Sequence, residues 1–233
     1  MKILILGGYG TFGGRLAELL ATDARLTLLI AGRSFTKAQA IIQTFPAGAQ
    51  KIALEFDRAG DVHTQLRACA PDLVIDATGP FQLYGDDPYV LVRACLEMGI
   101  HYLDFSDASD FVKGIDQFDA HAKAANIFML SGISSFPVLT AAVVRHLTQD
   151  WVKIKSITGG IAPSPHARFG LNVIKAICSY AGKPVKLRRQ GRDTAGYGIV
   201  ENRNYLIKST QVRPLPDIRF SLVDVPDLQV LPG

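Results

Sequence analysis

The first 150 residues alternate between short aliphatic runs and longer amphipathic stretches, and this rhythm restricts the fold more than any other feature of the chain. The aliphatic runs are continuous rather than alternating in polarity, which is typical of parallel strands buried on both faces. Six such runs are present, at 2–7, 26–32, 51–56, 73–77, 101–105 and 126–131. Helices are expected at 11–22, 34–45, 61–70, 88–98, 115–125 and 136–149. The pattern predicts an α/β fold with a doubly wound parallel sheet.

The rhythm changes after about residue 150. The segment VKIKSITGGIA, at 152–162, alternates apolar and polar residues, as an antiparallel strand with one face in solvent does. A helix is expected from about 168 to 181, and further strands near 184–190, 196–208 and 217–225. We therefore predict two domains, with residues 1–145 forming the doubly wound one and residues 146–233 forming part of a smaller α+β domain.

A glycine-rich turn, GGYGTFGG, stands between the first aliphatic run and the first expected helix. A G-x-G-x-x-G pattern begins at Gly8 and a G-x-x-G-x-x-G pattern at Gly7, and both share Gly10 and Gly13. Glycines at this spacing permit a tight turn, close approach of a pyrophosphate and close helix packing. A plain tight turn is the alternative, but the flanking strand and helix favour a Rossmann-type dinucleotide site. The expected contact residues are Gly7, Gly8, Gly10, Thr11, Phe12 and Gly13.

The end of the second aliphatic run indicates which dinucleotide is bound. An acidic side chain there would hold the ribose 2′-hydroxyl of NAD, but the chain has Arg33 followed by Ser34. Arg33 can form a charge-assisted pair with a 2′-phosphate, and Ser34 can donate a further hydrogen bond. We therefore predict NADP as the cofactor. The alternative is that Arg33 is an ordinary solvated residue before a helix.

Two further strand ends point toward the same edge of the predicted sheet, where ligands of open α/β sheets bind. Asp57 follows the third run and could contact the adenine, or it could cap the next helix. The turn Thr78-Gly79-Pro80 follows the fourth run. Gly79 allows close approach of the backbone to a ligand, and Pro80 keeps the preceding residue extended. We expect this turn to contact the ribose or nicotinamide of the cofactor.

Three stretches together resemble the NADP-binding domain of saccharopine dehydrogenase-like oxidoreductases: GGYGTFG with AGRS, DATGPFQLYG, and YVLVRACLEMGIHYLDFSD. The resemblance covers about residues 1–145. It implies a Rossmann domain followed by an α+β substrate domain, NADP(H) as cofactor, and hydride transfer at a carbon–nitrogen bond of an amino-acid-derived substrate. The family often continues HYLD with a Gly-Glu pair, where this chain has Ser106 and Asp107.

Candidate catalytic residues lie in HYLDFSD, at the end of the fifth run. Tyr102 and Asp104 could donate or accept a proton during reduction. Equally, Asp104 could cap a helix and Tyr102 could belong to the core. The loop that begins at Ser131 is another candidate, although its serines could serve only as caps. A short-chain dehydrogenase is not expected, because no tyrosine has a lysine four residues later.

Cysteine and histidine usage argues against disulfides and metals. The cysteines at 69, 95 and 178 are odd in number and lack a C-x-x-C spacing, and the five histidines show no metal-binding spacing. We therefore expect a reducing compartment and no metal. The chain has neither a signal-peptide core nor an apolar segment of membrane-spanning length. A cytoplasmic location without a membrane partner is expected.

Charge is distributed unevenly along the chain. Residues 1–150 carry 12 lysines and arginines against 16 acidic residues, whereas residues 151–233 carry 13 against 5. The basic part could attract a small, anionic substrate, and no nucleic-acid module is recognisable. The alternative is that most of these charges form an ordinary solvated basic face. A homodimer through the second domain is a further expectation. An NADP-dependent oxidoreductase is the main hypothesis, and the alternatives are a non-enzymatic NADP(H) sensor or an inactive fragment of a longer enzyme.

Overall fold

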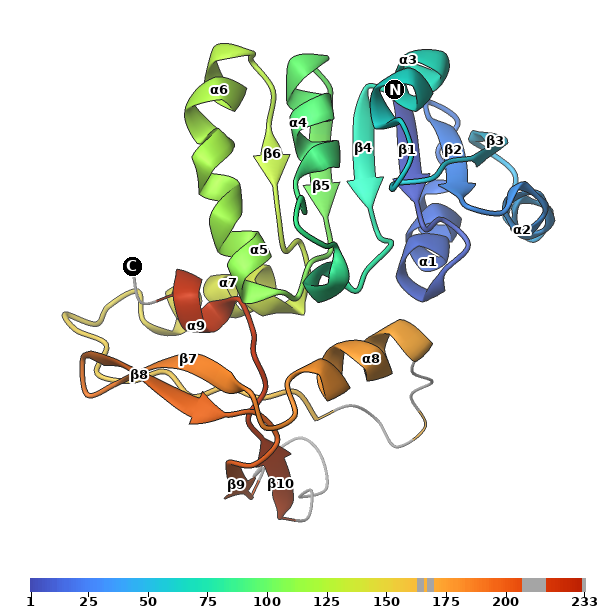
Figure 1. The fold of residues 1–233 in the computed structure, drawn as a ribbon. Coiled ribbons are helices and arrows are strands. Elements are labelled where there is room, and N and C mark those ends of the chain that lie inside the picture. The colour runs from blue at the N-terminus through green and yellow to red at the C-terminus, as the bar shows by residue number, and fades with distance from the viewer. Residues whose placement is uncertain (163–165, 167–169, 207–216, 232–233) are drawn as a thin grey trace. The chain divides into compact units, whose positions relative to one another are not determined.

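The structure is a computed structural model that describes residues 1–162, 166, 170–206 and 217–231. The chain forms two compact units, residues 1–134 (unit 1) and residues 135–233 (unit 2) (Figure 1). The domain boundary predicted at residue 145 lies inside helix α7 (Thr140–Leu147), which belongs to unit 2.

Unit 1 is built on one six-stranded parallel sheet with the strand order β3-β2-β1-β4-β5-β6 (Figure 1). This is the Rossmann order, in which the chain reverses direction across the sheet between β1 and β4. The strands are β1 (Lys2–Leu6), β2 (Thr27–Gly32), β3 (Gln50–Glu55), β4 (Leu73–Asp76), β5 (His101–Asp104) and β6 (Met129–Leu130). All six predicted strands are present, and the predicted fold class is confirmed.

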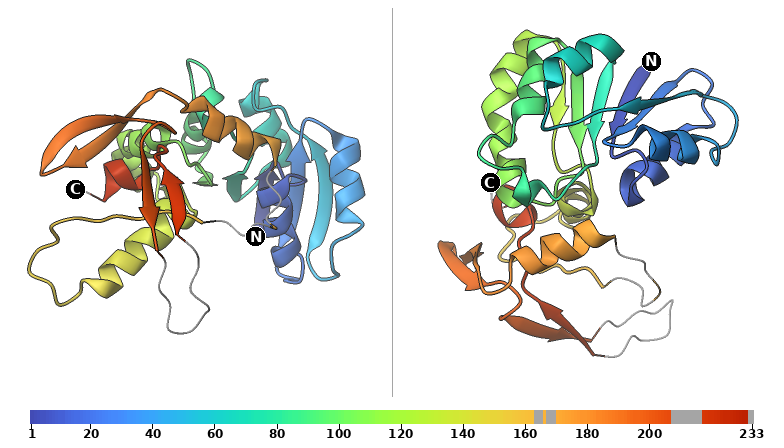
Figure 2. Two further views of the ribbon diagram at one scale, coloured as in Figure 1. Left: turned by 90° about the horizontal axis from the view of Figure 1, so that it is seen from below. Right: turned by 45° about the vertical axis from the view of Figure 1, so that its right-hand side comes forward.

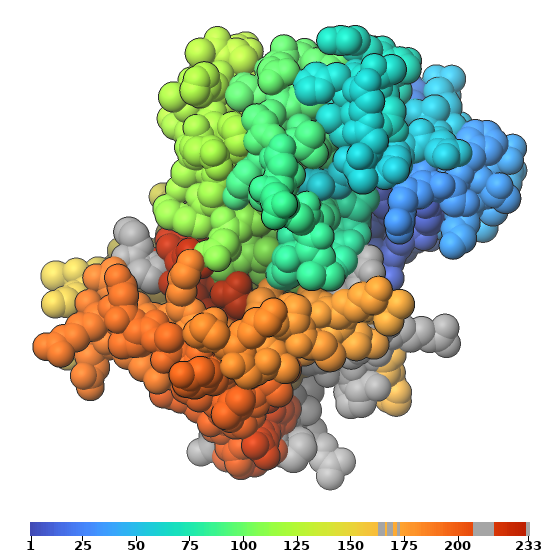
Figure 3. All heavy atoms as spheres, in the orientation of Figure 1, coloured from blue at the N-terminus to red at the C-terminus, as the bar shows by residue number. Residues whose placement is uncertain are grey.

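Helices cover both faces of this sheet (Figures 1 and 2). They are α1 (Thr11–Leu20), α2 (Phe35–Ile42), α3 (Val62–Cys69), α4 (Val90–Glu97), α5 (Ser109–Gly114) and α6 (Asp119–Ala124). Helices α1 and α2 pack on the face that presents Ile3 and Ile5 of β1. Helices α3 and α4 pack on the opposite face, which presents Leu4 and Leu6. Figure 3 shows this side of unit 1, with atoms of these two helices, coloured teal and green, at the surface.

Continuous apolar runs form these strands because both faces are buried. Leu4, Ile5 and Leu6 are fully buried, as are Leu28 and Ile30 of β2. Burial of each such side chain contributes roughly 1.5–3 kcal/mol relative to leaving it in water. The sheet is therefore fixed from both sides, and its loops are held at defined positions.

The helical region after β5 differs from the prediction of one helix at 115–125. It begins earlier, with α5, continues through a 3-10 segment η2 (Ile115–Phe118) and ends with α6. Just before α5, the hydroxyl of buried Ser106 accepts a hydrogen bond from the N–H of the N-cap residue Ala108 (3.2 Å). A local turn thus precedes the helix, which apolar periodicity alone did not indicate.

Unit 2 contains helices and two antiparallel strand pairs. A π-helical turn η3 (Ser135–Leu139) precedes α7, and the later elements are α8 (Leu171–Ser179), β7 (Pro184–Arg189), β8 (Arg192–Tyr197), β9 (Asn202–Tyr205), β10 (Ile218–Ser221) and α9 (Asp227–Val230). Strands β7 and β8 form a hairpin through Gln190 and Gly191, which both have positive φ, as a tight hairpin turn requires. The sole tryptophan of the chain, Trp151, is exposed in this unit.

The strand predicted at 152–162 is wrong. This segment has no regular secondary structure and pairs with no other strand of the described chain. Its apolar side chains, including Ile154 and Ile157, are exposed. Alternating polarity identifies a face that a strand could bury, but a strand also needs a hydrogen-bonded neighbour.

Three further observations bear on the sequence-based expectations. Cys69, Cys95 and Cys178 are all free thiols, and Cys178 is exposed on α8. No group of three metal-binding side chains is present among the described residues. In the same residues, no helix has both the length and the apolarity that a membrane crossing needs.

Candidate dinucleotide-binding site

The glycine-rich turn joins β1 to α1 and is packed without room for side chains. Gly7 has a φ of +73°, and a Cβ atom there would lie 2.7 Å from the Ala77 carbonyl oxygen. A Cβ on Gly10 would lie 3.0 Å from the Gly7 carbonyl oxygen, and one on Gly13 would be closer still to that oxygen. The glycines spaced three apart therefore gather around one carbonyl, so G-x-x-G-x-x-G describes the turn.

Gly8 is needed for a separate reason, because a Cβ there would lie 2.9 Å from both the Ile5 carbonyl oxygen and the Ile30 side chain. Helix α1 begins directly after Gly10, and Thr11 and Phe12 are exposed in its first turn. The first N–H groups of a helix have no acceptor within the helix, so they are available to an anion. The turn thus fits the pyrophosphate of a dinucleotide.

Arg33 and Ser34 form the turn between β2 and α2. The Arg33 side chain is exposed and makes no ion pair with any residue that the structure describes. Ser34 is the N-cap of α2, and its hydroxyl accepts a hydrogen bond from the Lys37 N–H (3.4 Å). The Ser34 N–H in turn donates to the hydroxyl of Tyr9, in the glycine-rich turn (3.1 Å). Both predicted residues therefore lie at the end of β2, beside the glycine-rich turn.

Asp57 lies in the loop after β3, where its carboxylate accepts a hydrogen bond from the Ala59 N–H (3.0 Å). It does not cap the next helix, because Asp61 is the N-cap of α3 and accepts from the Thr64 N–H (3.0 Å). The Asp57 side chain is exposed. Its geometry removes the capping alternative and leaves the predicted adenine contact as a prediction.

The turn Thr78-Gly79-Pro80 follows β4, next to β1 in the sheet. The Thr78 hydroxyl donates to Oδ1 of Asp76, the last residue of β4 (2.6 Å), and the Thr78 N–H donates to the same oxygen (3.0 Å). Gly79 has a φ of +27°, so the expectation that Pro80 keeps it extended is wrong. Side chains disfavour this backbone conformation, which glycine adopts readily. The aspartate therefore fixes the start of the turn.

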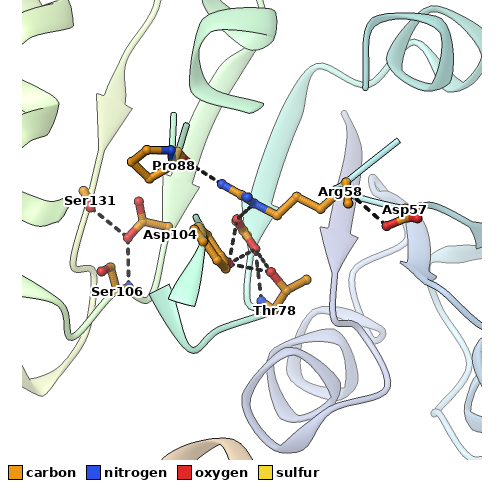
Figure 4. Close-up of polar contacts among 10 residues, drawn as sticks. Asp57, Arg58, Thr78, Pro88, Asp104, Ser106 and Ser131 are labelled. Carbon is orange, nitrogen blue, oxygen red and sulfur yellow. Dashed lines mark hydrogen bonds and ion pairs between the residues drawn. The ribbon is translucent and has the colours of Figure 1, made fainter. Parts of the chain in front are cut away.

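Asp76 is fully buried and is paired with Arg58, a residue that the sequence-based prediction missed. Arg58 comes from the loop after β3, and its Nε donates to Oδ2 of Asp76 (3.2 Å). Its guanidinium also donates to the Pro88 carbonyl and lies 3.4 Å from the ring centroid of Tyr84. Figure 4 shows the Arg58 side chain reaching from its own loop toward Pro88, above Thr78. One cation thus connects the loop after β3 to the end of β4 and to the segment between β4 and α4.

The Tyr84 hydroxyl completes this cluster, because it lies 2.6 Å from the Thr78 hydroxyl and donates to Asp76. Burial, together with the negative charge of Asp76, raises the pKa of Tyr84 above its usual range. The phenol therefore stays protonated and acts as a donor. The ring also packs against Phe81 and Phe111, at centroid distances of 4.7 and 6.0 Å.

Asp104 forms a second buried cluster, at the end of β5 (Figure 4). Its Oδ1 accepts hydrogen bonds from the Ser106 N–H (2.8 Å), the Ser131 hydroxyl (2.9 Å) and the Gly132 N–H (2.9 Å). Its Oδ2 is buried and has no hydrogen-bond partner among the described residues. Burial raises the pKa of Asp104 to about 6, although the three hydrogen bonds oppose the shift. The carboxyl thus joins the loops after β5 and β6 and changes charge near neutral pH.

Tyr102 lies two residues earlier on the same face of β5 and is fully buried in the core beside α4. Its hydroxyl has no hydrogen-bond partner among the described residues. Burial is the main cause that raises its pKa well above the usual value, and the nearby Asp104 adds to it. This environment favours the packing role for Tyr102. The catalytic roles of Tyr102 and Asp104 both stay predictions.

The residues predicted from strand ends and the newly found cluster share one location. Strands β1, β2, β3, β4 and β5 all end at the same edge of a parallel sheet, so the loops that follow them lie there together. A charged last residue in the otherwise apolar run LVID was the available signal for Asp76, because a buried carboxylate needs a countercharge. Nothing in the local sequence identifies Arg58 as that countercharge.

Comparisons with known proteins agree with this geometry. Residues 3–130 match the family described as saccharopine dehydrogenase NADP binding domain. A lipid droplet localized protein of Caenorhabditis elegans is 25% identical over 146 residues, which are 58% of this chain and 34% of that protein. The apo structure of saccharopine dehydrogenase (L-Glu forming) from Saccharomyces cerevisiae has a TM-score of 0.60 at 17% identity, over 89% of this chain and 47% of that chain.

The chain thus spans about a third of the worm protein and about half of the yeast enzyme. At 17% identity, the likeness to the yeast structure concerns the fold alone. The family match covers more than half of the chain and includes the glycine-rich turn, Arg33, Asp76 and Asp104. The chain belongs to the family of saccharopine dehydrogenase NADP-binding domains.

Proposed function

We propose that the chain binds NADP(H) in preference to NAD(H) and takes part in hydride transfer at a carbon–nitrogen bond of an anionic, amino-acid-derived substrate. The observation that carries the cofactor preference is the end of β2, where an exposed arginine, with no ion pair to any described residue, occurs in place of an acidic residue. An arginine there can bind a 2′-phosphate through two parallel hydrogen bonds.

The remaining cofactor contacts in this proposal follow the sheet edge. Gly7, Gly10 and Gly13 bring the backbone close to the pyrophosphate, and the first turn of α1 supplies N–H donors. Asp57 lies on the adenine side. The turn Thr78-Gly79-Pro80 approaches the ribose or nicotinamide, and bound NADPH would supply the hydride.

The substrate class rests on the family and on charge. The family is named for saccharopine dehydrogenases, and the region after residue 150 is strongly basic. An excess of lysine and arginine attracts carboxylate-bearing molecules. Asp104, whose pKa is raised to about 6, is the better placed of the two predicted proton-transfer groups, because a carboxyl with such a pKa exchanges protons near neutral pH.

A calorimetric titration of the whole chain with NADPH and NADH tests the cofactor preference. Arg33→Ala should weaken NADPH binding by roughly 10- to 100-fold, since charge-assisted hydrogen bonds are worth about 1.5–3 kcal/mol. NADH binding should change little. Arg25→Ala is the matched control, because Arg25 is also exposed in unit 1 but lies before β2, at the opposite edge of the sheet.

Two results would contradict the proposal. If the unmodified chain binds neither nucleotide, the glycine-rich turn is structural only. If Arg33→Ala weakens NADPH and NADH equally, Arg33 does not recognise the 2′-phosphate. For the reaction itself, we expect NADPH oxidation in the presence of imines formed from amino acids and oxo acids. Tight NADPH binding without turnover of any of these imines would contradict the proposed hydride transfer.

A non-enzymatic NADP(H) sensor is the second candidate, and one observation favours it. Tyr102 and Asp104, the two predicted proton-transfer residues, are both fully buried within unit 1. Under this alternative, NADPH binds tightly, and neither the unmodified chain nor Asp104→Asn shows turnover. Under the enzymatic proposal, Asp104→Asn lowers the rate by at least about 100-fold, as loss of a general acid does.

The cytoplasmic location and the homodimer predicted from the sequence remain part of this proposal. The worm relative is named for lipid droplets, so cell fractionation should include a lipid-droplet fraction. The native mass of the purified chain decides between monomer and dimer.

A further inference from the structure

We infer that Tyr9 determines cofactor specificity by positioning the Arg33-Ser34 turn that would receive the 2′-phosphate. This inference rests on the proposed NADP(H) binding and assigns a role to a residue that lies between two glycines of the motif, outside the expected contacts. Tyr9 belongs to the glycine-rich turn after β1, yet its side chain reaches the end of β2. It therefore connects the glycine-rich turn, which would bind the pyrophosphate, to the Arg33-Ser34 turn, which would bind the 2′-phosphate of the ribose.

The connection is a hydrogen bond to the backbone. The Tyr9 hydroxyl accepts from the Ser34 N–H at 3.1 Å, across 25 residues of sequence. Ser34 is the N-cap of α2 and has an extended backbone, with φ −131° and ψ 103°. A bond to this N–H fixes the peptide unit between Arg33 and Ser34. The direction in which the Arg33 side chain leaves the backbone is thereby fixed as well.

The ring of Tyr9 also occupies the space above Gly32, the last residue of β2. A Cβ atom on Gly32 would lie 2.6 Å from the Tyr9 hydroxyl oxygen and 2.7 Å from two ring carbons. Any side chain at residue 32 would therefore displace the tyrosine. An acidic residue at the end of β2 is what selects the 2′-hydroxyl of NAD, so Tyr9 in its present position is incompatible with an acid at residue 32.

The two contacts act together. The Tyr9 ring leaves no room at residue 32 for a carboxylate, which would repel a phosphate. The Tyr9 hydroxyl holds the following turn, from which the Arg33 side chain projects without a competing ion pair among the described residues. Preorganisation of this kind improves the affinity for a ligand because less freedom is lost on binding. This preorganisation should raise the affinity for NADPH but not that for NADH, because only NADPH carries the 2′-phosphate.

Tyr9→Phe tests the role of the hydroxyl, since it keeps the ring over Gly32 and removes one oxygen. The probes are NADPH and NADH, together with adenosine 2′,5′-bisphosphate and AMP, which differ only in the 2′-phosphate. We expect the affinities for NADPH and the bisphosphate to fall by roughly three- to tenfold, the range of one neutral hydrogen bond. The affinities for NADH and AMP should stay within about twofold of those of the unmodified chain, since the mutation leaves their contacts in place.

Tyr89→Phe is the matched control. It also removes a tyrosine hydroxyl that hydrogen-bonds to backbone in unit 1, in this case by donating to the Phe111 carbonyl (2.9 Å), but it lies just before α4. Its ratio of NADPH to NADH affinity should equal that of the unmodified chain. The double variant Tyr9→Ala with Gly32→Asp is the reciprocal test. It removes the ring, creates room for a carboxylate, and should shift the preference toward NADH.

The outcomes separate this inference from the proposal on which it rests. Binding of neither nucleotide by the unmodified chain, or an Arg33→Ala variant with unchanged preference, contradicts the proposed NADP(H) site itself. If Arg33→Ala lowers the preference but Tyr9→Phe leaves it unchanged, or weakens all four probes equally, then Tyr9 supports the turn in general and the inference is wrong. A selective loss for the two 2′-phosphorylated probes supports it.

Discussion

At the scale of single residues, two aspartates that end neighbouring strands have opposite surroundings. Asp76 and Asp104 are paired across β4 and β5 and both are fully buried. Asp76 has a guanidinium beside it, whereas no cation lies within salt-bridge distance of Asp104 in the described structure. A buried carboxylate without a cation is held by hydrogen bonds alone, so its charged form is less favoured than that of a carboxylate in water, and its pKa rises.

This difference predicts a pH dependence of stability. Because the pKa of Asp104 is about 6 when folded, against 3.8 as the usual value, the folded chain binds the proton more tightly than the unfolded chain. Asp104 therefore favours folding at low pH, and this contribution is lost as pH rises through about 4 to 6. Asp104→Asn should not show this loss. The free energy of unfolding of the variant minus that of the unmodified chain should therefore be higher by roughly 2 kcal/mol at about pH 7.5 than at about pH 4.5.

Urea unfolding of both proteins at these two pH values measures the effect. The comparison needs only the change with pH, so any constant cost of the asparagine cancels. If the free energy of unfolding changes equally with pH in the two proteins, Asp104 has an ordinary pKa and its Oδ2 is solvated.

At the scale of elements, Arg58 connects parts that belong to different strand-helix units. Its loop follows β3, its carboxylate partner ends β4, and its carbonyl partner precedes α4. The Arg58 side chain is 14% exposed and that of Asp76 is fully buried. The pair therefore lies inside the edge of the sheet, where removal of one partner leaves the other charge buried and uncompensated.

Arg58→Met should therefore destabilise the chain by about 3–5 kcal/mol, and the double variant Arg58→Met with Asp76→Asn by less, because no charge remains buried. Urea unfolding of both single variants, Arg58→Met and Asp76→Asn, and of the double variant gives the coupling between the two positions. Arg25→Ala, which removes an exposed pair with Asp23, should cause no measurable change. Equal losses for the single and double Arg58 variants would show that the charge pairing is not what stabilises this edge.

Most elements of unit 1 could be predicted from sequence because their signals are local. Aliphatic runs, the glycine spacing and the arginine after β2 each lie within a few residues of the structure they specify. The contacts that organise the site are distant in sequence: Tyr9 with Ser34, Arg58 with Asp76, and Asp104 with Ser131. Which distant partners meet is determined by sheet order, which one sequence does not specify.

Unit 2 was predicted less well for a related reason. Two-stranded pairs depend on turn geometry and on a partner strand, so the alternating segment at 152–162 suggested a strand that does not form. The hairpin turn at Gln190 and Gly191 could have been recognised, because a glycine between polar residues favours a tight turn. That signal would have placed strand β8 at its observed position.

At the scale of the whole molecule, unit 1 contains everything that the proposed nucleotide site requires. The six-stranded sheet, the two apolar clusters on its faces and every predicted cofactor contact lie within residues 1–134. A domain with its own core and a complete sheet can in principle fold alone.

A fragment of residues 1–134 should therefore fold cooperatively and bind NADPH within about threefold of the affinity of the whole chain, because no predicted contact is removed. Circular dichroism and calorimetry measure folding and binding, and the same fragment with Arg33→Ala is the control. An unfolded fragment, or one that binds more than about tenfold more weakly, would show that unit 2 contributes to the site or to its stability.

The position of Trp151 decides which optical signal can follow these experiments. The sole tryptophan is exposed, with 62% of its surface accessible, and it lies in unit 2. An indole already in water changes its emission little on unfolding. A thermal melt followed by tryptophan fluorescence would therefore show no transition when unit 1 unfolds. Tyr84, Tyr89 and Tyr102 are packed in the core of unit 1. Their near-ultraviolet circular dichroism is the signal that would record its unfolding.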